Sequence, residues 1–416
     1  MNLFQRARQM FAPRNAGASI SDLSAMTEMF NLNISPSGKA VTDLTAMQVS
    51  TVYACITKIA GAVTQLPINI YKHRGADGDE LIGRNALWWL LNESPHSNWT
   101  AASWKEWAVL CVALRGDAFT LIERDTRITS GGAILQLRPL NPDDVRVYRD
   151  KNWNAAYAVF DRATGQIRAV APDDIIHLHG YGFDGLRSYS VIQHAARVAV
   201  GNSLAANDFA GRTFQDGAMQ QIALKFPKQL TQAQADLIRS SFAATYGGTA
   251  GRKFPLVLSE GAEAQELSMS PEDAQMLESR QFEMHQICHA FGVPPILIGD
   301  SDKVSSWGTG IEQISIGFVR YTIKPMLKRW EEELNRKLYR QAPNFLRFEL
   351  TELLRGDAKS QSDYYRAALG GPGSGDAWMT VNEVRATQNL PPIPGGNEIY
   401  SNPKAMNNDQ ANSPAP

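Results

Sequence analysis

The sequence predicts an α+β fold, because helical and strand patterns dominate different stretches of the chain. Short strand patterns separated by turn signals fill residues 118–179, whereas two long amphipathic helical patterns lie at 270–292 and from about residue 311. The 416 residues are 44% hydrophobic, which is enough to bury a large core divided among several substructures.

The first half of the chain begins with a helical pattern and then becomes rich in strands. A helix is predicted over residues 47–65, with an apolar side formed by Val49, Val52, Ile56, Ile59 and Val63. The alternation in LPINIYKH predicts a strand, and two further helices are expected at 86–91 and 100–114, the second capped by Thr100. Six strands follow, at 118–124, 133–138, 145–148, 156–161, 167–170 and 175–179.

A compact inserted unit is expected between two helices. The first helix, over about 188–214, is rich in small residues that allow neighbouring helices to approach closely. A strand at 221–226, a helix at 231–246 and a strand at 254–258 then precede the helix at 270–292. This order predicts a strand-helix-strand unit carried on two helical stalks.

The stretch from residue 270 to 340 organises the rest of the chain. Its first helix has Pro271 at the first helical position and ends where Gly292 is followed by two prolines. A polar loop follows, and a longer amphipathic helix starts at about Ile311. Pro325 removes one backbone amide from this helix, so a kink is predicted there instead of a stop.

Three blocks of this stretch carry a family resemblance. SPEDAQMLESRQF, FGVPPILIGD and SSWGTGIEQISIGFVRYTIKPML resemble the HK97-like portal proteins of tailed double-stranded DNA phages, and the resemblance extends over about residues 45–390. It implies a portal fold with the following parts: an N-terminal arm at 1–44 that is partly disordered, a wing at 45–187, a stem helix at 188–216, a clip at 217–269, a second stem helix at 270–299, a tunnel loop at 300–310, a long kinked wing helix at 311–345, a helical crown at 346–401 and a disordered tail at 402–416.

The same resemblance implies a head-tail connector without enzymatic activity or cofactor. Proteins of this kind form a ring, usually a dodecamer, at one capsid vertex. The expected partners are double-stranded DNA, the terminase large subunit, a head-completion or adaptor protein and the major capsid protein. The protein is expected in the virion, and in the host cytoplasm during assembly, with no membrane partner. A formal charge of −1 fits weak, non-specific contact with DNA, since tight DNA binders are usually basic.

Two groups of residues are the candidate sites implied by the resemblance. The tunnel loop would line the DNA channel with Asp300, Ser301, Asp302, Lys303, Val304, Ser305 and Ser306. Trp307 is expected to anchor this loop in the core, although contact with DNA is the alternative. The clip carries basic residues, Lys225, Lys228, Arg239, Arg252 and Lys253, that would dock a motor or adaptor or simply form a solvated face.

Three other motifs point to alternative chemistry. His285, Cys288 and His289 share one helix at a spacing that could hold zinc, which leaves a metal-dependent hydrolase as an alternative, but the glutamate of such motifs is missing. His177 and His179 alternate on one strand, where plain strand alternation competes with a metal site. SSWGTG lacks the ending of a nucleotide-binding loop. A tail adaptor ring is a second alternative.

The cysteines give no sign of a disulfide framework. Cys55, Cys111 and Cys288 are far apart in the sequence and lie in apolar helical patterns. Their odd number predicts buried thiols in a reducing compartment.

Overall fold

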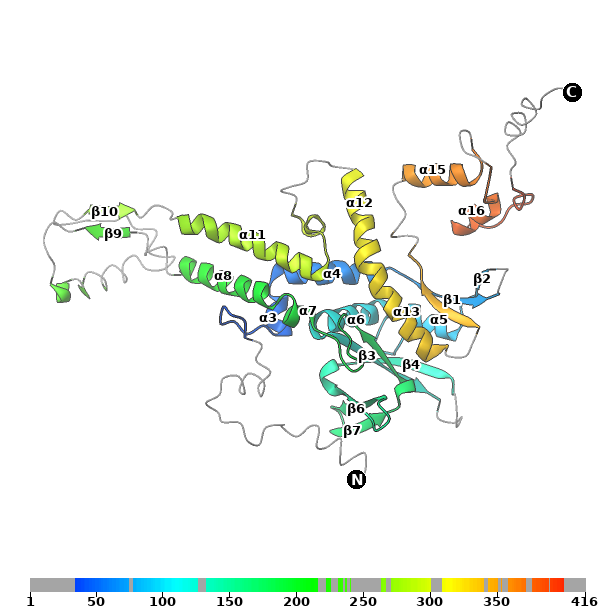
Figure 1. Cartoon of the computed structure of the whole chain (residues 1–416), viewed down its shortest axis with the longest axis horizontal. Helices are drawn as coiled ribbons and strands as arrows, with labels where there is room; N and C mark the ends of the chain where they lie inside the picture. Colours follow the sequence, from blue (N-terminus) through cyan, green and yellow to red (C-terminus); the bar gives the residue numbers. More distant parts are fainter. Residues whose placement is uncertain are drawn as a thin grey trace, which may run out of the picture. The chain divides into compact units, whose positions relative to one another are not determined.

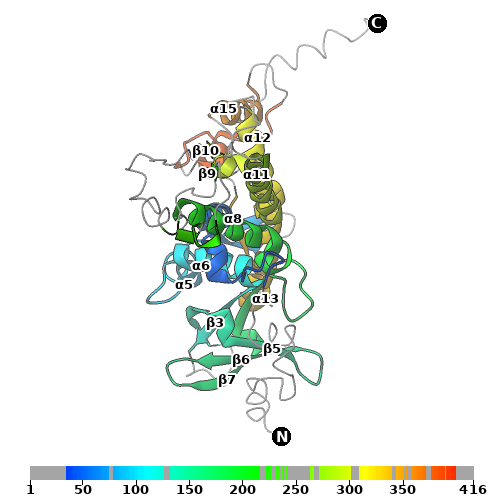
Figure 2. The ribbon, with the colours of Figure 1, turned by 90° about the vertical axis from the view of Figure 1, so that its left-hand side faces the viewer.

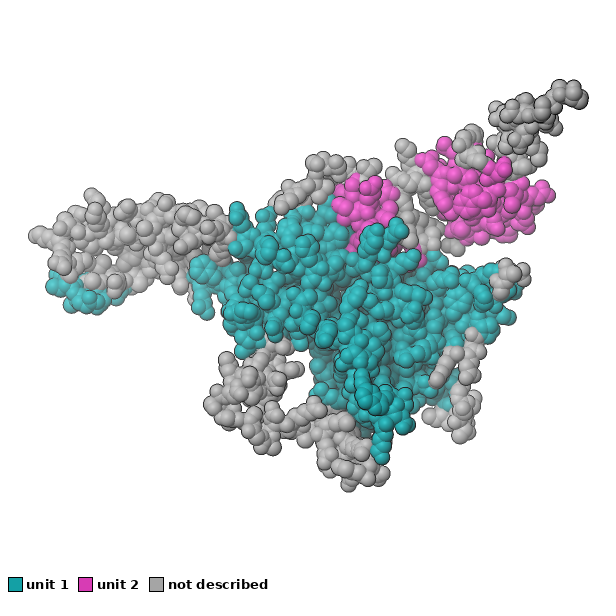
Figure 3. All heavy atoms as spheres, viewed as in Figure 1, with its two compact units in different colours: residues 1–304, 320–349 teal, residues 305–319, 350–416 magenta. Residues whose placement is uncertain are grey.

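A computed structural model gives the fold. It describes residues 34–74, 78–125, 132–215, 222–225, 231–234, 236–237, 240, 263–266, 271–300, 309–339, 343–350, 353, 358–371, 376–388 and 390–399. The chain divides into two compact units, Met1–Val304 with Arg320–Glu349, and Ser305–Val319 with Leu350–Pro416 (Figure 3). Within the described ranges, no helix combines the length and apolar character that a membrane crossing requires.

The first unit begins with helices that pack on one another (Figure 1). They are α3 (Asp43–Met47), α4 (Ser50–Thr64), α5 (Ala86–Asn92) and α6 (Ala101–Arg115). The single helix expected at 47–65 is therefore wrong at its start: a capping box of Thr42 and Thr45 starts α3, which ends before α4 begins. The expected apolar side of α4 is buried, and Thr100 caps α6 as predicted.

Two antiparallel sheets form the centre of the first unit. In one, β3 (Asp117–Arg124) lies between β4 (Ile134–Leu140) and β8 (Ile175–His179). In the other, β6 (Ala155–Asp161) lies between β5 (Val145–Arg149) and β7 (Gln166–Val170). All six predicted strands are confirmed. Their shared core comprises Phe119, Val145, Tyr157, Val159 and Ile175.

A third sheet contains two strands, β2 and β11, that were not predicted. β1 (Ile68–His73) pairs on one side with β2 (Asp79–Leu81) and on the other with β11 (Asn344–Phe348). The buried residues of β11, Leu346 and Phe348, face Ile70 and Ile68 in register.

The small-residue stretch forms two helices instead of one. α7 (Val191–His194) is followed by a break at 195–196 and then by α8 (Arg197–Gln215). α11 (Pro271–Phe291) has nearly the predicted bounds. Between them, β9 (Ile222–Lys225) is confirmed, but its partner is β10 (Glu263–Glu266), which was not predicted. The strand expected at 254–258 lies outside the described residues.

The long helix continues through its proline. α12 (Thr309–Phe318), a π-helical turn (Val319–Ile323) and α13 (Lys324–Leu338) keep residues 309–338 helical. Pro325 lies in the first turn of α13, directly after the π-helical turn, which accommodates the missing amide. The expected continuation past Pro325 is confirmed.

The second unit contains two helices within the region expected to form a helical crown. They are α15 (Ala358–Ala368) and α16 (Val381–Thr387), and α16 starts with the predicted capping box of Thr380 and Glu383. The amide of Trp378 donates to the Ala368 carbonyl at 3.0 Å, which holds the segment before α16 to the end of α15.

Candidate functional site

The two predicted stalk helices lie side by side. α8 and α11 contact each other and run antiparallel (Figures 1 and 2). Asn202 Nδ2 donates to Glu283 Oε1 at 2.7 Å, and an Arg280 guanidinium N–H donates to Asn207 Oδ1 at 2.7 Å. These hydrogen bonds between the two helices are polar.

A glycine brings the start of the described chain onto α8. A Cβ atom on Gly201 would lie 2.1 Å from Ser35 Oγ, so no larger residue fits at this contact. Lys39 also forms an ion pair with Asp208 of α8. Gly201 therefore allows a close approach by the segment at 34–40, whereas the prediction concerned neighbouring helices.

The C-terminal end of α11 is anchored in the core. Ile287 and Cys288 are fully buried, and Cys288 Sγ lies 3.9 Å from Cys55 Sγ of α4. The hydrogen bond with Cys288 and burial both raise the pKa of the Cys55 thiol. Both cysteines are core residues, as expected.

The helix end is also tied to the π-helical turn. Gly292 ends α11 with φ +65°, a left-handed conformation that favours glycine. Thr322 Oγ1 donates to the Gly292 carbonyl oxygen at 2.6 Å. The threonine thus satisfies a carbonyl at the helix terminus.

The geometry does not support the zinc hypothesis for α11. His285 Nδ1 lies 2.8 Å from the Gln281 carbonyl oxygen, and His285 Nε2 lies 3.1 Å from Asp300 Oδ2. Cys288 instead contacts Cys55. Among the described residues, no group of three His, Cys, Asp or Glu side chains is arranged to hold a metal ion.

The candidate loop is described only at its base. The Asp300 side chain is 12% exposed and pairs with His285, so it belongs to the packed base of the loop. Ser301, Asp302, Lys303, Val304, Ser305, Ser306 and Trp307 lie outside the described residues.

The clip candidates are likewise described at one position. Lys225 is the last residue of β9 and is in register with Glu263 of β10. Lys228, Arg239, Arg252 and Lys253 lie outside the described residues.

The structure reveals a buried polar network that sequence reasoning missed. Asp117 of β3 is 0% exposed, and its Oδ1 lies 2.9 Å from His177 Nε2 of β8. The Ser188 amide donates to both oxygens of Asp117 at 3.2 and 3.3 Å, and Arg187 lies 3.5 Å from Oδ2. The sequence separations of 60 and 71 residues leave no local signal of these contacts.

The network continues to the long helix. The His177 amide donates to Glu333 Oε1 of α13 at 3.2 Å, and Tyr157 Oη lies 3.3 Å from His177 Nδ1. Burial lowers the pKa of Arg187 and raises the pKa of Tyr157 to about 12. The network therefore fixes α13 and the segment leading into α7 onto the sheet.

His177 and His179 do share a strand face, but His177 is a buried partner of Asp117.

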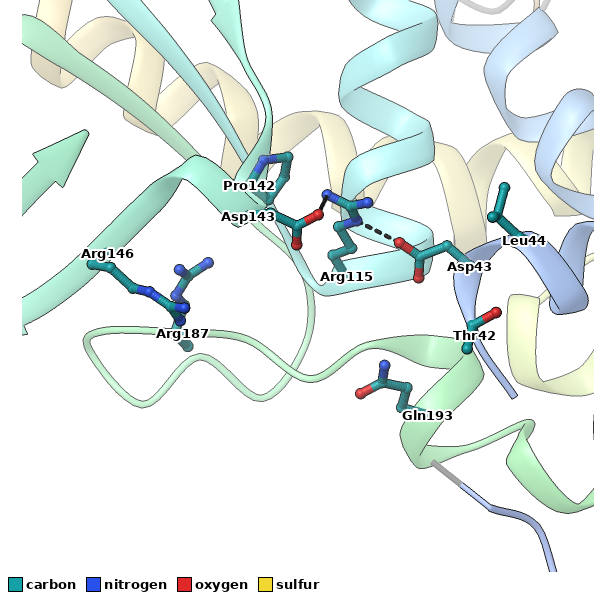
Figure 4. Close-up of a pocket in the computed structure, with 9 residues that line it drawn as sticks. All are labelled: Thr42, Asp43, Leu44, Arg115, Pro142, Asp143, Arg146, Arg187 and Gln193. Atoms are coloured by element: carbon teal, nitrogen blue, oxygen red, sulfur yellow. Dashed lines mark hydrogen bonds and ion pairs between the residues drawn. The ribbon is translucent and has the colours of Figure 1, made fainter. Parts of the chain in front are cut away.

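One surface pocket lies beside this network. It has a volume of about 640 Å³ and is lined by Thr42, Asp43, Leu44, Arg115, Pro142, Asp143, Arg146, Arg187 and Gln193. The Arg115 guanidinium lies between two carboxylates, 2.5 Å from Asp43 and 2.9 Å from Asp143 (Figure 4). These described lining residues include no histidine or cysteine, and opposite charges pair within the pocket.

Comparisons with known proteins agree with this architecture. The family model described as phage portal protein matches residues 50–389. The portal protein of Enterobacteria phage HK97 is 32% identical over 370 residues, which cover 86% of this chain and 82% of that protein. The probable portal protein of Streptomyces phage phiC31 is 28% identical, covering 88% and 80%.

Solved structures show the same fold. A chain from the neck of a native gene transfer agent particle, computed with C12 symmetry, matches with a TM-score of 0.57 at 21% identity and covers 88% of this chain and 100% of that chain. The crystal structure of an HK97 family phage portal protein from Corynebacterium diphtheriae matches with a TM-score of 0.51 at 18% identity, covering 74% and 95%.

Proposed function

The chain belongs to the phage portal protein family, and from this we propose that it forms a homo-oligomeric ring, a dodecamer, at one capsid vertex. The C12 symmetry of the related neck particle supports the number of subunits. The ring's channel would pass double-stranded DNA during packaging and ejection. The protein would be a virion component that assembles in the host cytoplasm.

The observation that carries this proposal is the helix pair. α8 and α11 are joined by polar contacts, and α11 is anchored through buried Cys288 to α4. In the ring these helices would be the stem that forms the channel wall, and the segment between them would be the clip. The sheets with α13 would form the wing, and residues 346–401 the crown.

The loop after the stem would narrow the channel. One Lys303 per subunit would give a ring of weak positive charge around the DNA, since a periodic set of charges forms a smooth potential. The negative charge of Asp302 would reduce the attraction between the ring of Lys303 side chains and DNA. The pairing of Asp300 with His285 supports a fixed base for this loop, because it holds the loop's first residue against α11.

The proposed protein partners would bind parts of the ring other than the loop. The clip, with Lys225, Lys228, Arg239, Arg252 and Lys253, would meet the terminase large subunit during packaging and a head-completion or adaptor protein afterwards. The wing would meet the major capsid protein. The portal itself would hydrolyse nothing, and the motor would supply the work. The contacts of His285 and Cys288 speak against a hydrolase.

The loop proposal is tested by charge reversal. Lys303→Glu would replace the weak attraction by repulsion, so we expect rings to assemble normally while DNA packaging or retention falls by about tenfold. The measurement pairs native mass with packaged DNA per particle. Lys303→Gln is the matched control, which removes charge without reversing it and should have a smaller effect.

Two results would contradict this role of the loop. Unassembled Lys303→Glu protein would make the residue structural, and wild-type packaging by intact mutant rings would remove it from the channel.

A further inference from the structure

The structure brings together two of the three cysteines of the chain. Cys55 on α4 and Cys288 on α11 are separated by 233 positions, yet their Sγ atoms lie 3.9 Å apart, and both residues are free and fully buried. Cys111, on α6, is also free and buried. We propose that Cys55 and Cys288 form a reversible disulfide that covalently joins α4 to α11 under oxidising conditions.

The geometry requires little movement. The two thiols are near van der Waals contact and share a hydrogen bond, whereas a disulfide brings the sulfur atoms to about 2.05 Å. The sulfurs must therefore approach by about 2 Å. Cysteine side chains have one rotatable bond between backbone and sulfur, so small rotations at both residues supply most of this movement.

The chemistry balances with a peroxide as the oxidant. The thiolate of one cysteine attacks a peroxide oxygen, the O–O bond breaks, and a sulfenic acid and water are formed. The second sulfur then attacks the sulfenic sulfur, the S–O bond breaks, and water leaves. Two thiols and one hydrogen peroxide thus give one disulfide and two water molecules, and a small thiol reductant reverses the reaction.

Burial of both sulfurs controls the rate of the first step, the attack of a thiolate on the peroxide. Both sulfurs are screened from solvent, which limits access of an oxidant. The hydrogen bond with Cys55 lowers the pKa of Cys288, so Cys288 is the thiolate that attacks the oxidant. A small oxidant is needed, and the rate should rise with pH. The second step is fast, because the partner sulfur is already in contact. A reducing compartment would keep the pair as thiols, and oxidation would follow only outside it.

The disulfide would restrain the position of α11. The bond would close a loop between positions 55 and 288 and fix the C-terminal end of α11 to the core. A loop of this length restricts the unfolded chain strongly, and the melting temperature should rise by roughly 5–10 °C. This inference rests on the contact between α4 and α11, and it stands whether or not the chain forms a ring.

The test treats the purified full-length protein with hydrogen peroxide at about pH 8.5 and maps its peptides without reduction. We expect a peptide linking Cys55 to Cys288, a mass loss of about 2 Da, and a fall from three free thiols to one when the protein is denatured. Dithiothreitol should restore the thiols and the lower melting temperature.

Matched variants distinguish this reaction from general oxidation. Cys111→Ala should still form the link, whereas Cys55→Ala and Cys288→Ala should each gain oxygen on the remaining thiol instead. The proposal is overturned if wild-type protein gains sulfinic or sulfonic adducts without the linked peptide, if its thiols do not react, or if Cys111 enters links as often as Cys288.

Discussion

In the first unit, the contacts that stabilise the sheet core and those on the α8–α11 helix pair differ in their exposure to solvent. In the sheet core, Asp117, His177 and Glu333 are nearly inaccessible to water and complete one another's hydrogen bonds. On the helix pair, Asp208 pairs with Lys39 and Arg280 donates to Asn207, both at the exposed surface. Buried charge pairs are costly to break, whereas exposed ones contribute little. The sheet core should therefore be stable in one subunit, and the helix pair should gain its stability from neighbouring subunits.

The largest effect is expected at Asp117. Asp117→Ala leaves His177, Arg187 and the Ser188 amide without their common partner, so the free energy of unfolding should fall by about 3–5 kcal/mol. Urea unfolding followed by tryptophan fluorescence measures the loss. Asp117→Asn keeps the acceptor oxygen and should lose less. A loss below about 1 kcal/mol for the alanine variant would contradict the role of the network.

The next effect is a pH dependence caused by Lys105 of α6. This side chain is buried, donates to the Leu66 carbonyl oxygen at 2.7 Å, and has its pKa lowered by burial to about 8. Because the folded-state pKa is below the unfolded one, the charged form opposes folding below about pH 8, and stability rises as pH increases from there toward 10.5.

Lys105→Met removes this titration with little change of volume. Between about pH 7 and 10, wild-type protein should gain roughly 2 kcal/mol relative to the variant, as measured by urea unfolding at each pH. Parallel curves for the two proteins would mean that Lys105 is not desolvated in the folded state.

A smaller effect is expected at Thr322, which links the π-helical turn to α11. Thr322→Val keeps the shape but removes the donor to the Gly292 carbonyl, and should cost about 1 kcal/mol. Thr322→Ser keeps the hydroxyl and serves as the control. Unchanged stability of Thr322→Val would contradict a contribution from this hydrogen bond. Urea unfolding again provides the measurement.

The smallest effect is expected at the exposed surface of α8, where it contacts the segment at 34–40. Asp208 is exposed and pairs with Lys39, and this ion pair lowers the pKa of its carboxyl. Asp208→Asn should leave the melting temperature of a single subunit unchanged, because solvent screens such a pair. A drop comparable to that of Asp117→Ala would erase the contrast between the two regions.

The sequence was most informative where local patterns decide the structure. The six strands of the two central sheets and the caps at Thr100 and Thr380 follow from alternation and capping chemistry. β10, with the sequence EAQE, has no apolar alternation and gave no signal. β11, in contrast, has apolar residues at alternate positions, Leu346 and Phe348, which is a strand signal that the sequence contains.

The candidate site was predictable in outline only. The stalk helices and the loop position follow from helix signals and from the family resemblance. The partners of Asp117 and the contact of Cys55 with Cys288 depend on tertiary structure, because these residues are 60 or more positions apart. The pairing of His285 with Asp300 likewise required the fold, since a turn of 3₁₀-helix (Pro295–Ile298) brings the loop base back to α11.

The most direct test of the ring proposal is the native mass of the purified protein, measured together with negative-stain images. The proposal predicts a particle of about twelve subunits with a central hole, as in the related neck particle of C12 symmetry. A strict monomer at high concentration, both alone and with the capsid proteins of its own particle, would contradict it.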